Sequence, residues 1–268
     1  MIFTFLGTGT SQGVPMIGCS CKVCTSMNPR DKRLRSSIMV EDKSSRIVID
    51  TGPDFRQQML REDIQSLDGV VFTHEHKDHI AGLDDVRAFN YLQKKPMDVF
   101  ATHQVQQALR REFHYIFSGD TYPGIPRLKI HTIDENIFTA FDFIIQPVPV
   151  KHMDLSVLGF RIGGFSYITD ANLITESSKN ILVNSEVLVL NALRREKHIS
   201  HFNLDEAVDL VNELKPKRAF FTHISHQLGL HDEVNNELPL HIRCAYDGLK
   251  VEINYNLKPR IKSQEVPD

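Results

Sequence analysis

The segment GVVFTHEHKDH, residues 69–79, joins an apolar run directly to four side chains that can bind a metal ion. His74 and His76 are two positions apart, so both rings point the same way from an extended loop. Asp78 and His79 follow at the start of HIAGLDD, which has a helical pattern. Imidazole and carboxylate ligands together suit Zn, Mn or Fe better than Ca or Mg. The segment therefore predicts a metal site at a strand-to-helix turn, a more specific interpretation than a His-rich surface loop.

Three later strands each end in another ligand-type side chain. His152 ends FIIQPVPVKH, Asp170 ends FSYITD and His223 ends RAFFTH. Functional groups collect at strand ends in parallel and mixed sheets, because neighbouring strands end side by side. Each residue alone has an ordinary explanation, such as a capping carboxylate or a surface histidine. Together with the first segment, they provide ligands for two ions, with one carboxylate available to bridge them.

The rest of the 268-residue chain has the patterns of alternating strands and helices. Apolar or alternating runs predict strands at MIFTFLG, SSIMVED, SRIVIDTG, MDVFATH, most of residues 127–170, SEVLVLNAL, RAFFTHIS and GLKVEINY. Helical patterns occur in PDFRQQMLRED, HIAGLDDVRAF, HQVQQALRREFHYIF and NLDEAVDLVNELKP. In the last of these, Asn203 and Glu206 predict a capping box and Pro216 predicts the end of the helix. Two groups of strands with interspersed helices predict a layered α/β fold, with residues 1–268 as one domain.

Charge and hydropathy argue against several classes of protein. A net charge of −3 provides no basic surface for a large nucleic acid. No apolar run approaches the roughly 18 residues that a membrane span needs, and MIFTFLGTGTSQG lacks the basic region of a secretory signal. Three of the four Cys are clustered, which fits reduced thiols better than a disulfide framework. We therefore expect a cytoplasmic protein without a membrane partner.

Cys19, Cys21 and Cys24 lie together in the short segment GCSCKVC. Three thiols this close indicate a tetrahedral metal site that lacks one ligand. His226 in THISHQ and Cys244 in HIRCAYDG are the candidate fourth ligands, although a lone Cys in a strand is usually just buried. The alternative is a cluster of three thiols without a metal.

These motifs resemble those of a known family. THEHKDH, followed by His, Asp and His at strand ends, resembles the H-x-H-x-D-H pattern of the metallo-β-lactamase superfamily. LGTGTSQGVP, GCSCKVC, IDTGPDFR, THISHQ and YDG resemble its PhnP branch, the phosphoribosyl cyclic phosphodiesterases, over nearly the whole chain. The resemblance implies a four-layer αββα sandwich with a di-metal centre at one edge. It implies one metal on His74, His76 and His152, a second on Asp78, His79 and His223, and Asp170 bridging both.

The same resemblance implies a structural zinc site in the N-terminal loop, at about residues 18–26. In PhnP-like proteins a His at the position of His226 completes a site with three N-terminal Cys, so the resemblance favours His226 over Cys244. A Cys₃His site is closed, with no open position for a substrate. Its effect would be to hold the N-terminal loop against the loop that carries His223.

The implied activity is hydrolysis of a small cyclic phosphodiester, of the phosphoribosyl cyclic phosphate or cyclic nucleotide class. Two divalent ions, Zn or Mn with Fe as an alternative, would neutralise the phosphate and lower the pKa of a bridging water. The predicted catalytic residues are Asp78 and Asp170, at the metals, and His201, as proton donor to the leaving alkoxide. Asp50 in IDTG is predicted to orient a ligand imidazole, with a structural role in the turn as the alternative.

Other functions on the same fold stay open. A tRNase Z-like RNA endonuclease shares the ligands, but its long tRNA-binding arm would lie between His152 and Asp170, which are only eighteen positions apart. A lactonase or thioester hydrolase has the same ligands. A non-catalytic carrier like the PqqB proteins is the alternative from a different class.

Three further features concern the surroundings of the site. Residues 86–130 form a longer stretch than the PhnP pattern carries, and we expect them to roof the pocket. Arg33, Arg35 and Lys151 are candidates for contacting a substrate phosphate, with none preferred. We expect a small phosphodiester as the partner molecule, and a homodimer is an open alternative to a monomer.

Overall fold

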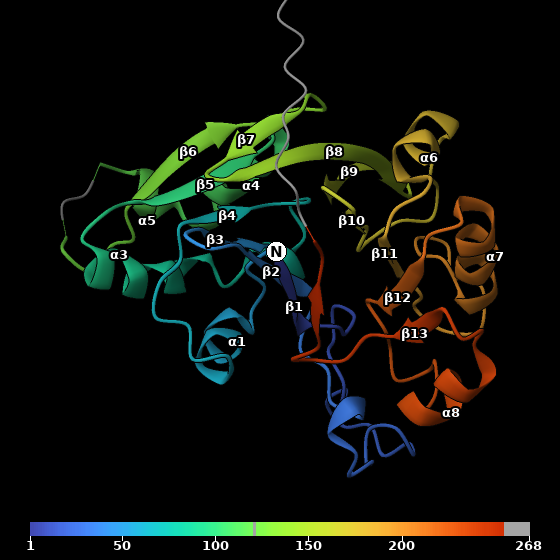
Figure 1. Ribbon diagram of the computed structural model, residues 1–268. Coiled ribbons are helices and arrows are strands. Elements are labelled where there is room, and N and C mark those ends of the chain that lie inside the picture. The colour runs from blue at the N-terminus through green and yellow to red at the C-terminus, as the bar shows by residue number, and fades with distance from the viewer. Residues whose placement is uncertain (120–121, 255–268) are drawn as a thin grey trace, which may run out of the picture.

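The computed structural model describes residues 1–119 and 122–254, and it contains two β-sheets (Figure 1). Residues 120–121, in the stretch expected to roof the pocket, lie outside the described residues. Residues 255–268, the end of the predicted single domain, lie outside them too.

The first sheet has the strand order β14-β1-β2-β3-β4-β5-β6, and the second sheet has the order β13-β12-β11-β10-β9-β8-β7. The strands of the first sheet are β1 (Ile2–Gly7), β2 (Ser37–Glu41), β3 (Arg46–Ile49), β4 (Gly69–Val71), β5 (Met97–Ala101), β6 (Leu128–Thr132) and β14 (Lys250–Glu252). Those of the second are β7 (Phe138–Ala140), β8 (Phe143–His152), β9 (Leu155–Ile162), β10 (Phe165–Tyr167), β11 (Val187–Asn191), β12 (Arg218–Thr222) and β13 (Ile242–Cys244).

Both sheets are mixed, with antiparallel hairpins beside parallel strands. In the first sheet β3, β4, β5 and β6 are parallel neighbours, and in the second β10, β11, β12 and β13 are. The parallel strands end at the same edge of each sheet. This brings the segments that follow β3, β4, β10 and β12 to one edge, where the candidate ligands lie.

Helices cover the outer face of each sheet, so the chain forms the predicted four-layer αββα sandwich (Figure 1). The first sheet packs on its outer side against α1 (Phe55–Arg61), α3 (Arg87–Gln93) and α4 (His103–Glu112), with α2 (Lys77–Ile80) and α5 (His114–Phe117) beside them. The second sheet packs against α6 (Glu176–Leu182), α7 (Leu204–Leu214) and α8 (His231–Glu237). The fold class predicted from the sequence is therefore confirmed.

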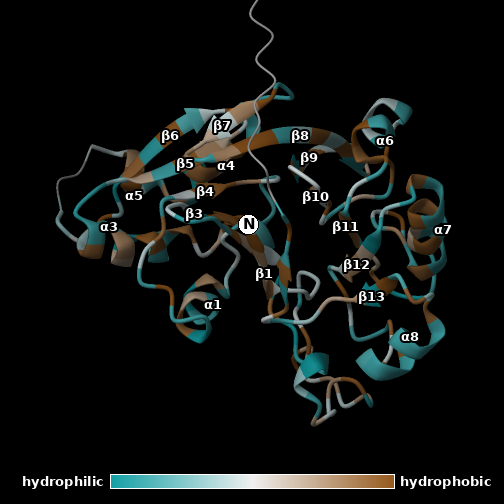
Figure 2. Cartoon of the chain, viewed as in Figure 1, coloured by the Kyte–Doolittle hydropathy of each residue, from teal (hydrophilic) through white to brown (hydrophobic). Residues whose placement is uncertain are grey.

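The core between the two sheets consists of large apolar side chains from both. The rings of Phe3 and Phe165 stack across it, with their centroids 3.8 Å apart. Figure 2 shows the hydrophobic strands in the middle of the molecule and a largely hydrophilic α8 on the outside. Burying these side chains stabilises the fold by roughly 25 cal/mol per Å² of apolar surface removed from water.

Several predicted helices differ from the observed ones. HIAGLDDVRAF is not continuous, because a 3₁₀ turn, η2 (Leu83–Val86), separates α2 from α3. Gly82 lies at this break, and a Cβ there would lie 2.1 Å from the carbonyl oxygen of Gly52. The long helix predicted from HQVQQALRREFHYIF is divided at Phe113 into α4 and α5. The helices α6 and α8 were not predicted.

The predicted boundaries of α7 are confirmed. Asn203 accepts a hydrogen bond from the backbone of Glu206, and the Glu206 carboxylate accepts one from the backbone of Asn203, which is the predicted capping box. The helix ends at Lys215, in a left-handed conformation with φ 52°, directly before Pro216.

Residues 86–130 lie elsewhere than expected. Their described part contributes β5 and the start of β6 to the first sheet, and α3, α4 and α5 pack their apolar side chains on the outer face of that sheet instead of roofing the site. At the start of α4 the stretch contacts the His-rich loop, where Gln104 donates a hydrogen bond to Glu75.

Among the described residues, no helix has the length and hydrophobicity to cross a membrane.

Candidate metal centre

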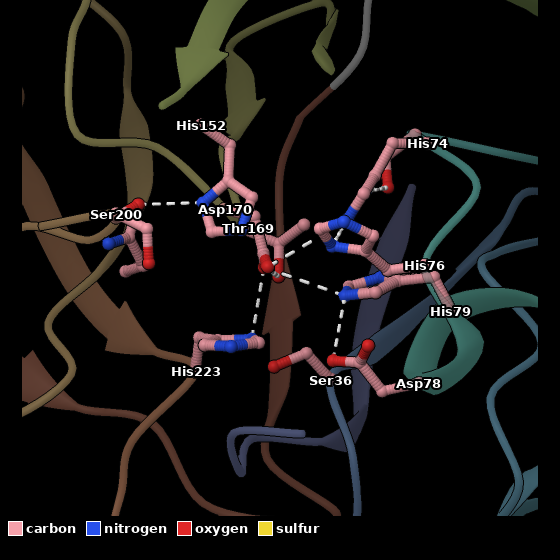
Figure 3. Close-up of polar contacts among 12 residues, drawn as sticks. Ser36, His74, His76, Asp78, His79, His152, Thr169, Asp170, Ser200 and His223 are labelled. Atoms are coloured by element: carbon pink, nitrogen blue, oxygen red, sulfur yellow. Dashed lines mark hydrogen bonds and ion pairs between the residues drawn. The ribbon is translucent and has the colours of Figure 1, made fainter. Parts of the chain in front are cut away.

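Asp170, which follows β10, lies at the centre of the site with histidine rings around it (Figure 3). Its Oδ1 atom is 3.0 Å from Nδ1 of His223 and 3.6 Å from Nε2 of His79. Its Oδ2 atom is 3.8 Å from Nε2 of His74. The two oxygens of one carboxylate thus face different groups of histidines, as a bridging ligand would.

Two groups of donor atoms share this carboxylate. Those of Asp78, His79, Asp170 and His223 lie within 4.8 Å of one another, and so do those of His74, His76 and Asp170. His152 instead forms a group of this size with Asp170 and His201. All seven predicted active-site ligands are therefore brought together, although His152 is less close to its predicted partners, with ring centres 5.2 Å from His76 and 6.0 Å from His74.

Unusual backbone conformations position two of these segments. Asp50, directly after β3, and His223, directly after β12, have φ angles of 66° and 55°, in the left-handed region. Non-glycine residues there carry strain that the surrounding structure must offset, and such strain is common at functional sites. Gly52 allows the segment after β3 to approach the His-rich loop, since a Cβ there would lie 2.1 Å from the carbonyl oxygen of Asp78.

Asp50 fixes the orientation of two histidines. Its carboxylate accepts hydrogen bonds from the backbone N–H and the hydroxyl of Thr73, at 2.9 and 2.8 Å. The Thr73 hydroxyl then accepts from Nδ1–H of His74 at 2.9 Å, and Nδ1–H of His79 donates to Asp50 at 2.8 Å. In both rings Nδ1 is the donor and Nε2 faces Asp170, so Nε2 is the nitrogen that would offer its lone pair to a metal ion.

His152 is oriented by a backbone carbonyl. Its Nδ1 lies 2.6 Å from the carbonyl oxygen of Ser200, which can only accept, so Nε2 carries the lone pair. The sequence analysis missed Ser200, since a backbone carbonyl leaves no signal in the residue type. It also missed Thr73, whose position inside FTHEH was the available signal, and Thr10, whose hydroxyl lies 3.3 Å from Nε2 of His223.

Buried ring nitrogens without hydrogen bonds show that the site fits a cation. Nε2 of His79 and Nδ1 of His223 make no hydrogen bond, although carboxylate oxygens lie 3.2 and 3.0 Å away. Burial alone lowers the pKa of His79, but Asp78, Asp170 and Asp50 outweigh it and raise that pKa well above its usual value. Burial raises the pKa of Asp170, yet His223 and His79 bring it well below its usual value. Ionised carboxylates beside inward-facing ring nitrogens fit a divalent metal.

His201 lies against the same cluster. Its ring centre is 4.5 Å from that of His152 and 4.8 Å from that of His223, and its Nδ1 is buried without a hydrogen bond. Burial, with His223 next in effect, lowers its pKa to about 3, so the ring is neutral at pH 7. The structure thus places the predicted proton donor beside the candidate ligands, and its catalytic role stays a prediction.

A second cluster lies in the N-terminal loop. The Sγ atoms of Cys19 and Cys21 are 3.4 and 3.3 Å from Nδ1 of His226, and with Cys24 the four donor atoms lie within 4.8 Å of one another. Hydrogen bonding by the Cys24 backbone N–H, followed by His226, lowers the pKa of Cys21 to about 6, which favours the thiolate that zinc needs. Cys244 is buried in the core beneath the second sheet, apart from this cluster. Of the two candidates, the geometry brings His226 to the thiols, and zinc binding stays a prediction.

The three cations that were candidates for contacting phosphate have other partners. Arg33 is buried and donates to the hydroxyl of Thr8 and the carbonyl of Ala245. Arg35 forms an ion pair with Asp54 at 2.9 Å. Lys151 donates to Ser156 at 2.8 Å.

Comparison with known proteins agrees with this geometry. The family model described as beta-lactamase superfamily domain matches residues 45–224. A crystal structure of a diphosphatase from the PhnP family superposes with a TM-score of 0.87 at 41% identity, covering 93% of this chain and 96% of that one. Zn(2+)-bound PqqB from Methylobacterium extorquens has a TM-score of 0.77 at 17% identity, covering 94% of this chain and 100% of that one, which shows a common fold.

Curated relatives match over part of their length. A protein named octanoyltransferase from Porphyromonas gingivalis is 39% identical over 93% of this chain and 51% of its own length. A ribonuclease Z from Bradyrhizobium diazoefficiens is 27% identical over 59% of this chain and 48% of its own length. The chain thus spans about half the length of the curated relatives it matches.

Proposed function

We propose, from the premise that this chain belongs to the metallo-β-lactamase superfamily and to its PhnP-like branch, that this hydrolase is a di-metal phosphodiesterase acting on a small cyclic phosphodiester. The observation that carries the proposal is the position of Asp170. Its two oxygens face different histidines, Oδ1 facing His79 and His223 and Oδ2 facing His74, an arrangement that suits two neighbouring cations. A phosphodiester fits such a pair because its negative charge lies between them.

The chain would hold one cation with His74, His76 and His152, and another with Asp78, His79 and His223. Bound there, two Zn, Mn or Fe ions would supply positive charge for the phosphate and lower the pKa of a water between them. Asp50 and the Ser200 carbonyl would keep the ligand rings in the tautomer that presents a lone pair. The carboxylate of Asp170 would be a ligand of both cations.

His201 would hold the proton for the leaving oxygen. Its ring is neutral in the free protein, because burial lowers its pKa to about 3. To act as the proton donor, His201 would have to be protonated when the substrate is bound, and negative charge developing on the leaving oxygen beside the ring would favour that form. The proposal has two other parts. Cys19, Cys21, Cys24 and His226 would hold a structural zinc ion. The protein would be cytoplasmic, monomeric or homodimeric, with no membrane partner.

Two relatives suggest neighbouring substrates. The similar crystal structure is that of a diphosphatase, and a diphosphate is cleaved at a P–O bond by the same kind of chemistry. The octanoyltransferase name points to acyl esters, which are substrates for the alternative of a lactonase or thioester hydrolase. Half of that relative lies outside the match, so its name does not assign octanoyl transfer to the matched half.

The ribonuclease Z alternative is less favourable. Between His152 and Asp170 the chain contains β9, β10 and short turns, which leave no room for a tRNA-binding arm.

The alternative from a different class is a non-catalytic carrier like the PqqB proteins. Such a carrier would not need His201 as a proton donor.

The test is turnover of bis-p-nitrophenyl phosphate, a phosphoribosyl cyclic phosphate, cyclic nucleotides, a nucleoside diphosphate, an octanoyl thioester and a lactone, with added Mn²⁺ or Zn²⁺. Metal-dependent release of product from a phosphodiester, lost in Asp170→Ala and retained in Asp209→Asn on the exposed face of α7, supports the proposal. Preferred cleavage of the diphosphate would favour the diphosphatase. Turnover of the thioester or lactone alone would replace phosphate chemistry with acyl chemistry. No turnover with full metal occupancy would favour the carrier.

A further inference from the structure

An open cleft lies between the two sheets, beside the candidate metal centre. Its volume is about 390 Å³, within the usual range for small-molecule sites. One wall comes from the start of α4 and the residues after β6, and the other from the β8–β9 hairpin. A hydrogen bond from the backbone of Leu158, in β9 of the second sheet, to the carbonyl of Thr73, in the segment after β4, links the two sheets.

The cleft and the metal centre share the same loops. Lys151, which lines the cleft, directly precedes His152. Gln104, on the opposite wall, donates a hydrogen bond to Glu75, which lies between His74 and His76 in the chain. The cleft thus lies next to the segments that carry His76 and His152, and a substituent that extends from a phosphate at the metal centre past Lys151 would reach it.

The lining combines an aliphatic floor with a polar rim. Ile133 and Leu158, nearly fully buried members of the core between the sheets, form this floor, whereas the side chains of Val150 and Val157 at its edge belong to the apolar cluster on the other face of the second sheet. The described residues that line it include no Phe, Tyr or Trp, and His103 at the start of α4 offers only the small imidazole ring for stacking against a planar base. The floor suits a flexible aliphatic group, which gains from burial without needing a directed partner.

The rim disfavours a second negative charge. Asp134 and Glu135 lie on it, and hydrogen bonds from the backbone and side chain of Asn136 lower the pKa of Asp134, which is therefore ionised at neutral pH. Lys151 is the opposing cation, and it is already hydrogen-bonded to Ser156. An additional phosphate, as in a nucleoside diphosphate, would meet two carboxylates.

We infer that this cleft is the subsite for an uncharged aliphatic group carried by the phosphate substrate. The inference rests on the proposed function, since it assumes that phosphate is held at the metal centre. It extends that function by assigning the class of substituent and the residues that select it.

Binding of alkylphosphonates tests the inference without any turnover. Methyl-, butyl- and hexylphosphonate share one phosphonate head and differ in aliphatic length, so titration calorimetry on the Mn²⁺-loaded protein isolates the cleft. Affinity should rise roughly fourfold for each methylene that becomes buried. Equal affinities for the methyl and hexyl compounds would overturn the inference.

Ser156 provides the matched variants, because it lines the cleft and is exposed. Ser156→Trp should remove the dependence of affinity on chain length by filling the cleft. Ser156→Ala, which loses the hydroxyl without adding bulk, should keep it, and so should Leu240→Trp at a remote, 90% exposed position. Thermal melting of each variant verifies folding.

The outcomes separate the two proposals. A chain-length dependence that persists in Ser156→Trp would place the aliphatic group elsewhere and refute the subsite. If bis-p-nitrophenyl phosphate is not hydrolysed but the dependence is present and sensitive to Ser156→Trp, the proposed function fails and the subsite stands. If the diester is hydrolysed and all three phosphonates bind equally, the function stands and the subsite fails.

Discussion

The Nδ1 atom of His79 lies 2.8 Å from Oδ2 of Asp50, a residue 29 positions earlier in the chain. The two residues are buried, and Thr73 completes the set of donors to the same carboxylate. Burial raises the pKa of Asp50, and His79 and Thr73 oppose that rise. Asp50 therefore acts on the candidate centre through the rings that it orients.

Replacing Asp50 should weaken metal binding without removing a ligand. In Asp50→Ala, His79 and Thr73 lose their acceptor, so the ring of His79 is free to rotate or change tautomer. We expect metal affinity to fall about 10–100-fold, the usual effect of such outer partners. Competition with a metal-sensitive dye would measure it, with the exposed Asp209→Asn as control. Unchanged affinity would limit Asp50 to a structural role in the turn.

Asp170→Ala should have a larger effect on metal content. Its carboxylate faces both groups of histidines, and its loss leaves two neighbouring cations to repel each other without the bridge. We expect elemental analysis to find at most half of the wild-type active-site metal. Full occupancy in this variant would show that Asp170 is not the shared ligand.

His201→Ala should leave metal content intact and change the dependence on the leaving group. An alkoxide needs a proton to leave, whereas a nitrophenolate hardly does. Hydrolysis of an alkyl phosphodiester should therefore slow about 10²–10⁴-fold, and that of a p-nitrophenyl diester much less. The measurement is the ratio of the two rates in wild type and variant. Equal slowing of both substrates, or loss of metal, would exclude His201 as the proton donor.

Cys21→Ser should remove the ion in the N-terminal loop. The low pKa of Cys21, about 6, makes it the thiolate most readily available to zinc in this cluster. We expect loss of the zinc that resists chelators and a fall in Tm on the order of 10 °C. The control is Cys244→Ala, since Cys244 lies in the core beneath the second sheet, and this variant should keep its zinc. Zinc that is unchanged in Cys21→Ser would contradict the structural site.

His231 should make the protein less stable in acid. Burial, with Arg33 next in effect, lowers the pKa of His231 to about 4, below its value of 6.5 in an unfolded chain. Between these pH values the unfolded chain binds more protons than the folded one, so stability falls as the pH falls from 6.5 toward 4. The loss attributable to His231 is up to about 3 kcal/mol.

Urea denaturation at pH 7 and pH 4 would measure this loss in wild type and in His231→Gln. The variant has no imidazole to protonate, so the difference in stability between the two pH values should shrink. Any zinc held by the thiols would be lost alike from both proteins in acid, so the comparison isolates His231. An identical difference in both proteins would assign the acid sensitivity to other groups.

The layered fold and the grouping of the ligands could be predicted from the sequence, because apolar runs that end in His or Asp report strand ends directly. His74, Asp170 and His223 needed only the expectation that parallel strands end together. The break in the helix at Gly82 could not be predicted, since it depends on a close approach to Gly52, far away in the chain.

The surroundings of the site were harder to predict than its ligands. The carbonyl of Ser200 orients His152, and any residue type offers a carbonyl. Arg33 is a candidate phosphate ligand by its charge, but its burial against Thr8 and Ala245 appears only in three dimensions. Such partners are set by packing between distant segments, for which the sequence has no local pattern.

The segment after β12 carries His223 toward Asp170 and, three positions later, His226 toward the thiols of Cys19 and Cys21. An ion at either cluster restricts the same short stretch of backbone. Part of the ordering entropy for the second ion would then already be lost, which would give positive cooperativity between the two clusters. The supply of zinc to the thiols would thereby set how readily the other centre fills, and partial starvation would yield empty and fully loaded molecules in preference to half-loaded ones.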